Sequence, residues 1–307
     1  MLKKLFYTTA IFGGILLFSG CSGNSSKSQE SNQDDFSLSD SDVNSDAPLE
    51  LSEEIMGDVI QNISSPVEMA SLIKKSGAGF SQKTLNKPEK VDDYNTSFKR
   101  ALNLGVFSAD LGYINTFDKN NIVVSYLLSV KELAEGIKVG QFFDFAALKE
   151  MASSSNNLDS LMEVSINSFN KMDSYLRDQN RSNVSTLIVT GAWVEGLYIS
   201  GKVIQETNNE ELINRMGEQK DIIDILLIIL ENYSKDPNFA ELVSRMEQIK
   251  QAYAEVKITT EFGEPKRIEK DGTLIIVQDE ISHVEITPEQ IDKILVEISS
   301  LRDFIVS

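Results

Sequence analysis

The sequence reads Gly105-Val-Phe-Ser-Ala-Asp-Leu111 in one apolar stretch and Gly191-Ala-Trp-Val-Glu-Gly-Leu197 in another. Both stretches follow the pattern Gly-x-aromatic-x-x-x-Leu inside long segments with helical periodicity. Glycine inside a helix costs about 1 kcal/mol relative to alanine, so its repeated use indicates close contact between two helix backbones. We therefore expect a degenerate internal duplication, in which two similar helices cross at the centre of a bundle.

Helical periodicity continues on both sides of these stretches. Ser65-Pro66 has the residues of an N-cap and a first-turn proline. Residues 222–230 are apolar on nearly every side but too few to span a membrane, so we place them inside a helical core. The helices predicted after residue 48 are Leu49–Ile63, Pro66–Lys75, Asp92–Phe117, Asn121–Ile137, Asp144–Ala152, Asn157–Gln179, Val184–Thr207, Glu210–Tyr233 and Pro237–Val256.

A segment rich in β-branched residues precedes the C-terminal helix. The short strands predicted there are 256–262, 265–269, 273–277 and 283–286, with a two-residue turn at Asp271-Gly272. Thr287 and Gln290 predict a capping box at the start of the last helix. The expected fold is mainly α, a helical bundle with a small β-hairpin insertion before the C-terminal helix, in one globular domain over residues 49–307.

The N-terminal segment has the features of an export signal. Two lysines precede an apolar run, residues 5–18, that is too short to span a bilayer stably. The run ends in Leu17-Phe-Ser-Gly-Cys21, and small residues before the chain's one cysteine resemble the lipobox of bacterial lipoproteins. The resemblance implies that residues 1–20 are a lipoprotein signal peptide and that Cys21 becomes a lipidated, palmitate-bearing N-terminus.

The residues after Cys21 predict where and how the domain is held. Several acyl chains would anchor the protein firmly to a membrane. Ser22 stands where Asp would be the inner-membrane retention signal, so by resemblance to bacterial sorting we expect the outer membrane. Residues 21–48 are rich in Ser, Asp and Asn and cannot bury enough apolar surface to offset chain entropy. They are predicted to be a disordered acidic tether.

Composition excludes several classes of function. The chain has 307 residues, with 29 Lys+Arg against 47 Asp+Glu, so its formal net charge of −18 argues against nucleic-acid binding. One cysteine excludes an internal disulfide framework and a cysteine-based zinc site, and one histidine excludes most catalytic triads and His-rich metal sites. We find no phosphate-binding glycine loop, nucleophile elbow or dinucleotide fingerprint. No cofactor or metal ligand is therefore predicted.

The two glycine-containing stretches also carry a family resemblance. Residues 101–113 and 191–198 resemble a group of uncharacterised lipoproteins from Bacteroidetes-type bacteria, over about Ser64 to Val256. The resemblance implies a helical, membrane-anchored protein. It implies no function, because the motifs that carry it have no assigned chemistry.

The candidate site residues lie in the same two stretches. Asp110 and Glu195 are carboxylates in otherwise apolar helices, and they would converge if the helices cross near their glycines. Paired carboxylates can share a proton, hold a divalent cation or divide acid and base roles. The alternative is that each faces solvent or bonds to a tyrosine or a backbone amide. Tyr113, Trp193 and Tyr198 could complete a ligand pocket with polar tips, or simply be core.

Two hypotheses on function follow. The first is a non-enzymatic accessory or binding lipoprotein that engages an envelope protein partner or a small ligand. The second is a carboxylate- or metal-dependent helical enzyme centred on Asp110 and Glu195. Buried, facing carboxylates with raised pKa values would favour the enzyme. A plain apolar core with an exposed hydrophobic patch would favour the binding module.

Overall fold

The computed structural model describes residues 66–152, 158–270, 273–277 and 280–307. Several predicted features lie outside these residues: the signal peptide, Cys21, the tether, the first helix Leu49–Ile63, the N-cap Ser65 and the turn Asp271-Gly272. The domain boundaries predicted at residues 20 and 48 therefore stay predictions.

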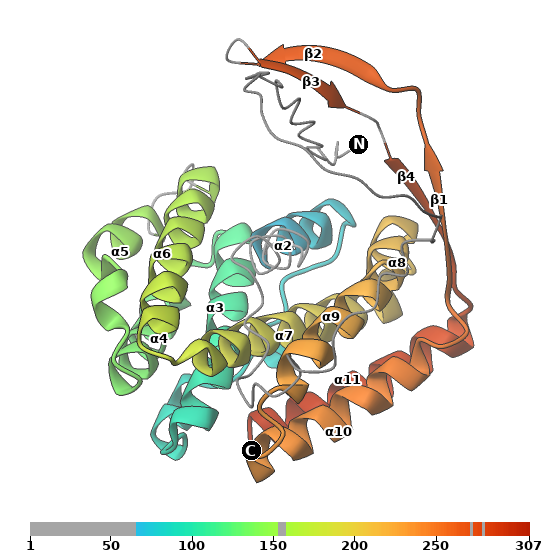
Figure 1. The fold of residues 1–307 in the computed structure, drawn as a ribbon. Coiled ribbons are helices and arrows are strands. Elements are labelled where there is room, and N and C mark those ends of the chain that lie inside the picture. The colour runs from blue at the N-terminus through green and yellow to red at the C-terminus, as the bar shows by residue number, and fades with distance from the viewer. Residues whose placement is uncertain (1–65, 153–157, 271–272, 278–279) are drawn as a thin grey trace, which may run out of the picture. The chain divides into compact units, whose positions relative to one another are not determined.

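Helices make up most of the described chain and confirm the predicted mainly α fold (Figure 1). They are α2 Pro66–Lys75, α3 Ser97–Thr116, α4 Asn120–Gly136, α5 Phe145–Ala152, α6 Leu158–Asp178, α7 Ser182–Thr207, α8 Glu210–Gly217, α9 Gln219–Glu231, α10 Pro237–Ala252 and α11 Pro288–Ile305. Short 3-10 turns are η1 Gln82–Thr84, η2 Pro88–Asp93 and η3 Gly140–Phe142.

The β-rich segment lies between α10 and α11 in the chain, as predicted. Strand β1 (Lys257–Phe262) pairs with β4 (Glu280–Glu285), and β2 (Lys266–Lys270) pairs antiparallel with β3 (Thr273–Val277). Residues 260–281 belong to a different compact unit from the helical unit, which contains residues 282–307 with α11.

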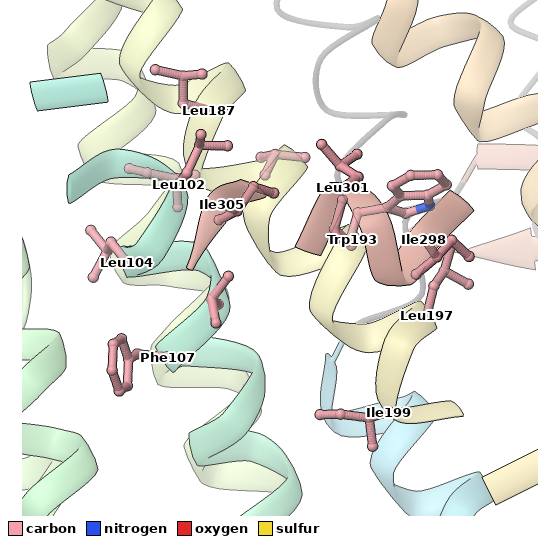
Figure 2. Packing of buried hydrophobic residues seen from close by; sticks show 14 of the residues in the cluster. Leu102, Leu104, Phe107, Leu187, Trp193, Leu197, Ile199, Ile298, Leu301 and Ile305 are labelled. Atoms are coloured by element: carbon pink, nitrogen blue, oxygen red, sulfur yellow. The ribbon is translucent and has the colours of Figure 1, made fainter. Parts of the chain in front are cut away.

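The centre of the helical unit is the crossing of α3 and α7, the most extensive contact between described helices. A Cβ atom added to Gly105 would overlap the carbonyl oxygen of Ile188, and one added to Gly191 would overlap that of Leu102. The predicted backbone contact at these glycines is confirmed. Figure 2 shows the buried apolar side chains around it, contributed by α3, α7 and α11.

Two predicted helices differ from the structure by more than two residues at one end. The helix expected over Asp92–Phe117 begins at Ser97, because Thr96 caps it by accepting a hydrogen bond from the Lys99 backbone N–H at 3.1 Å. The helix expected over Pro237–Val256 ends at Ala252.

The single helix predicted over Glu210–Tyr233 is wrong, because the structure has α8 and α9 there. Helix α8 ends at Gly217 and α9 begins at Gln219. A Cβ atom added to Gly217 would overlap the Val284 side chain of β4. Gly217 therefore packs closely against a side chain of β4. The turn at Asn208 and Asn209 is as predicted, with Asn208 left-handed at φ 48° and Asn209 capping α8.

Helix α7 is central to the core. Of the helices that the structure describes, α7 is the one long and apolar enough to cross a membrane by length and composition. However, 78% of its most apolar 18-residue stretch is buried inside the helical unit. A core helix of a globular unit passes the same test. We therefore interpret α7 as the core helix against which α3 and α11 pack.

Candidate functional site

Asp110 and Glu195 come together just beyond the crossing of α3 and α7. Each lies little more than one helical turn after its glycine, Gly105 or Gly191. Because the helix backbones touch at these glycines, the two side chains lie at about the same distance from the crossing point. Both residues are 0% exposed, and Glu195 lies close enough to Asp110 to raise the pKa of its carboxyl group. The structure therefore places the two carboxyl groups as a buried pair.

A residue of the C-terminal helix completes this pair. Arg302 on α11 binds Glu195 with both ends of its guanidinium group, Nε to Oε2 at 2.7 Å and Nη2 to Oε1 at 2.9 Å. Nη2 also donates to the carbonyl oxygen of Thr84 at 3.2 Å. Arg302 is 7% exposed, so this is a bidentate ion pair inside the core. We call Asp110, Glu195 and Arg302 the buried triad.

Asn86 links the buried triad to the segment before α3. Its backbone N–H donates to Oδ2 of Asp110 at 3.0 Å, and its carbonyl oxygen accepts from the Tyr126 hydroxyl at 2.7 Å. Its side-chain amide donates to the Tyr94 hydroxyl at 3.0 Å. A backbone amide bonded to a carboxyl group was one of the alternatives left open for Asp110 from the sequence.

The C-terminal end of α11 accepts hydrogen bonds from side chains that precede or belong to α3. Asn103 donates through Nδ2 to the carbonyl oxygen of Ile305 at 2.8 Å, and Lys90 donates to that of Val306 at 2.7 Å. These donors satisfy carbonyl groups that the last turn of a helix cannot pair internally. Side chains before and within α3 therefore fix the position of Arg302.

The electrostatics of the triad follow from its burial. Desolvation raises the pKa of Asp110 well above its usual range, and the negative charge of Glu195 raises it further, while Arg302 opposes the shift. Burial works to lower the pKa of Arg302, but the attraction and hydrogen bonds of Glu195 outweigh it, and the pKa rises. Burial also raises the pKa of Tyr126.

Only some of the predicted ligand-binding residues meet at this place. Tyr198 borders the triad, because the Arg302 guanidinium lies 4.2 Å from its ring centroid. Tyr113 instead accepts a hydrogen bond from the Ser81 backbone N–H at 3.0 Å, and its ring stacks on Phe80 at 5.3 Å. The five residues predicted as one ligand site are therefore not one cluster.

Trp193 also lies apart from the triad. Its Nε1 donates to Oε1 of Gln219 at 3.0 Å, and both side chains are buried. The bond joins α7 to α9 and satisfies the polar end of an otherwise apolar ring. Trp193 is thus part of the core, which was the alternative interpretation of the aromatic residues.

Sequence reasoning missed Arg302, although a signal was present. The residues Ile291, Ile294, Leu295, Ile298, Leu301 and Ile305 form the apolar stripe of the last helix. Arg302 falls on the same stripe, at i+4 from Ile298 and i+7 from Leu295. A charged residue on a buried stripe needs a buried partner of opposite charge. The two carboxylates in apolar helices were the candidates.

The geometry argues against a divalent cation between the two carboxylates. Both oxygens of Glu195 are bonded to Arg302, so the cation facing this carboxylate is a guanidinium group. In the described parts of the chain, no group of three or more His, Cys, Asp and Glu side chains is arranged to hold a metal ion.

Comparisons with protein-family models, with curated proteins and with solved structures find no match to this chain. The resemblance to Bacteroidetes-type lipoproteins therefore stays a prediction. The function is argued below from the chain's own residues.

Proposed function

We propose that the protein is a membrane-anchored lipoprotein of the bacterial cell envelope whose helical domain is a non-enzymatic accessory or binding module at the outer membrane. The observation that carries this proposal is Leu17-Phe-Ser-Gly-Cys21 after two lysines and a short apolar run. The chain's one cysteine stands where a lipobox requires it. An acidic stretch, residues 22–48, follows directly and would separate the anchor from the domain.

The chemistry of the buried triad supports a structural role for the carboxylates. Asp110 and Glu195 are 0% exposed, and the oxygens of Glu195 are bonded to Arg302. A substrate would have to break a bidentate ion pair to reach them. A buried ion pair with satisfied hydrogen bonds holds packed elements in one arrangement, which suits a rigid binding domain better than an active site.

The test is lipid attachment in a bacterial host with a lipoprotein-processing pathway. Cells expressing the full chain or its Cys21→Ser variant are fed an alkyne-bearing palmitate analogue, and their membranes are separated on a density gradient. We expect label and outer-membrane location for the wild-type chain and neither for the variant. Equal labelling of the two chains, or wild-type protein without label, would reject the proposal.

The binding role is tested on the same two chains. Wild-type and Cys21→Ala proteins are crosslinked in intact cells, captured through a C-terminal tag and compared by quantitative mass spectrometry. We expect an envelope protein in near-stoichiometric amount with the anchored chain alone. If capture is empty, a ligand screen on the purified protein is the remaining test of the binding role, and no hit there would contradict it.

One observation favours the alternative of a carboxylate-dependent enzyme. The pKa of Asp110 is raised well above its usual range by burial and by the facing Glu195, as expected of an acid catalyst. The bonding of Glu195 to Arg302 opposes this interpretation. A thermal-shift screen with Mg²⁺, Ca²⁺ and small ligands distinguishes the two. A ligand that stabilises the wild-type protein but not Asp110→Asn would favour the enzyme.

A further inference from the structure

The buried triad contains two acidic groups and one basic group. If both Asp110 and Glu195 were ionised, one negative charge would remain uncompensated beside Arg302, in side chains that are 0–7% exposed. Burying an unpaired charge is costly, and a carboxyl group in that position takes up a proton instead. Charge balance inside the core therefore calls for one proton on the carboxyl pair.

Hydrogen bonding indicates where that proton lies. Both oxygens of Glu195 accept from Arg302, and Oδ2 of Asp110 accepts from the Asn86 backbone N–H. Oδ1 of Asp110 is buried, and within the described part of the chain no N–H or O–H donor reaches it. The neighbouring carboxyl group is that of Glu195, which as a carboxylate only accepts. Two facing acceptors make a favourable contact when one of them carries a proton.

Other titratable groups near Asp110 direct their protons elsewhere. The Tyr126 hydroxyl on α4 donates to the carbonyl oxygen of Asn86, and the Tyr94 hydroxyl donates to that of Val306 at 3.4 Å. On α2, which packs against α3, Lys74 is exposed and pairs with Asp118 at 3.2 Å. The charged groups that face Asp110 are therefore Glu195 of α7 and Arg302 of α11.

We propose that Asp110 is a neutral carboxylic acid in the folded protein and donates its proton from Oδ1 to Glu195. The buried triad then has no net charge and joins α3, α7 and α11 through one proton and two charge-assisted hydrogen bonds. Loss of this proton at high pH leaves two carboxylates facing each other and weakens the hold on α11. The inference concerns the fold alone and does not depend on lipid attachment.

The direction of the pH effect follows from linkage. An unfolded Asp side chain has a pKa of about 3.9, so unfolding above that pH releases the proton that the folded protein holds. The stabilisation is fully present below about pH 3.9. It is lost as pH rises through the raised pKa of folded Asp110. Within this window the unfolding equilibrium constant gains about tenfold per pH unit from this group.

Asp110→Asn tests the proposal, because an asparagine side chain matches a neutral carboxylic acid in shape and keeps a donor toward Glu195. Urea unfolding of the full chain and of the variant, purified in detergent, is measured at pH 5, 6, 7 and 8. We expect the ratio of the two unfolding constants to change by about tenfold per pH unit below the folded pKa. A ratio that stays constant over this range would overturn the proposal.

Asp173→Asn is the matched control. Asp173 is also a buried aspartate with an oxygen that lacks a hydrogen-bond donor, but its partner is Arg177, at 2.8 Å. Because Asp173 is bonded to a guanidinium group, we expect its ratio not to change tenfold per pH unit. If Asp110→Asn does not fold, infrared spectroscopy of the wild-type chain labelled with ¹³C-aspartate decides. The carbonyl stretch of a protonated aspartic acid is expected at neutral pH, and its absence would refute the assignment.

Discussion

At the scale of single residues, the bidentate pair of Arg302 and Glu195 has the largest predicted effect on stability. Arg302→Met keeps much of the side-chain volume but leaves the Glu195 carboxylate buried without its cation. Breaking a buried pair from one side typically costs about 3–5 kcal/mol, so we expect a loss of this size in urea unfolding. Arg245→Met is the control, because Arg245 pairs with the half-exposed Glu241 and an exposed pair contributes at most about 1 kcal/mol.

A second substitution separates lost charge pairing from lost packing at the same position. Glu195→Gln combined with Arg302→Met removes both charges and leaves an amide oxygen to accept from Asp110. We expect the double variant to be more stable than Arg302→Met alone, because the uncompensated carboxylate is gone. A double variant that is no more stable than Arg302→Met would show that packing, and not charge, dominates.

At the scale of helices, the crossing of α3 and α7 depends on two glycines. Gly191→Ala places a methyl group where the Leu102 carbonyl oxygen lies, so the helices must separate. We expect a destabilisation of about 1–3 kcal/mol or more, as for overpacked cores, measured by urea unfolding. Gly196→Ala is the matched control on the same helix. Nothing lies within 4 Å of its added Cβ. Alanine there should stabilise the protein by up to about 1 kcal/mol.

At the scale of the whole molecule, the division into compact units predicts unequal resistance to opening. Helices α3 and α7 are buried along most of their length, whereas β2 and β3 lie within residues 260–281 of the other unit. Hydrogen exchange followed by mass spectrometry should show α3 and α7 exchanging through global unfolding, and β2 and β3 exchanging earlier. Equal protection of both sets of peptides would mean that the two units open together.

Features that depend on local interactions were predictable from the sequence. The capping box of Thr287 and Gln290 is present, with bonds of 2.8 and 3.3 Å, and α2, α4 and α6 begin and end close to their predicted residues. Helix periodicity and caps arise from residues a few positions apart, so one segment contains the information. The boundary missed between α8 and α9 lies beside Gly217, which packs against Val284 of β4, a residue far away in the chain.

In the candidate site, too, some features depend on local sequence and others on packing between distant segments. The sequence predicts that Asp110 and Glu195 lie in apolar helices and that glycines let those helices touch. The folded structure was needed to show that Arg302 neutralises Glu195, and that Trp193 and Tyr113 pack elsewhere. The partner of a buried charge is chosen by which helix faces cover one another. For Glu195 that choice depends on packing between segments 107 residues apart, about which local periodicity carries no information.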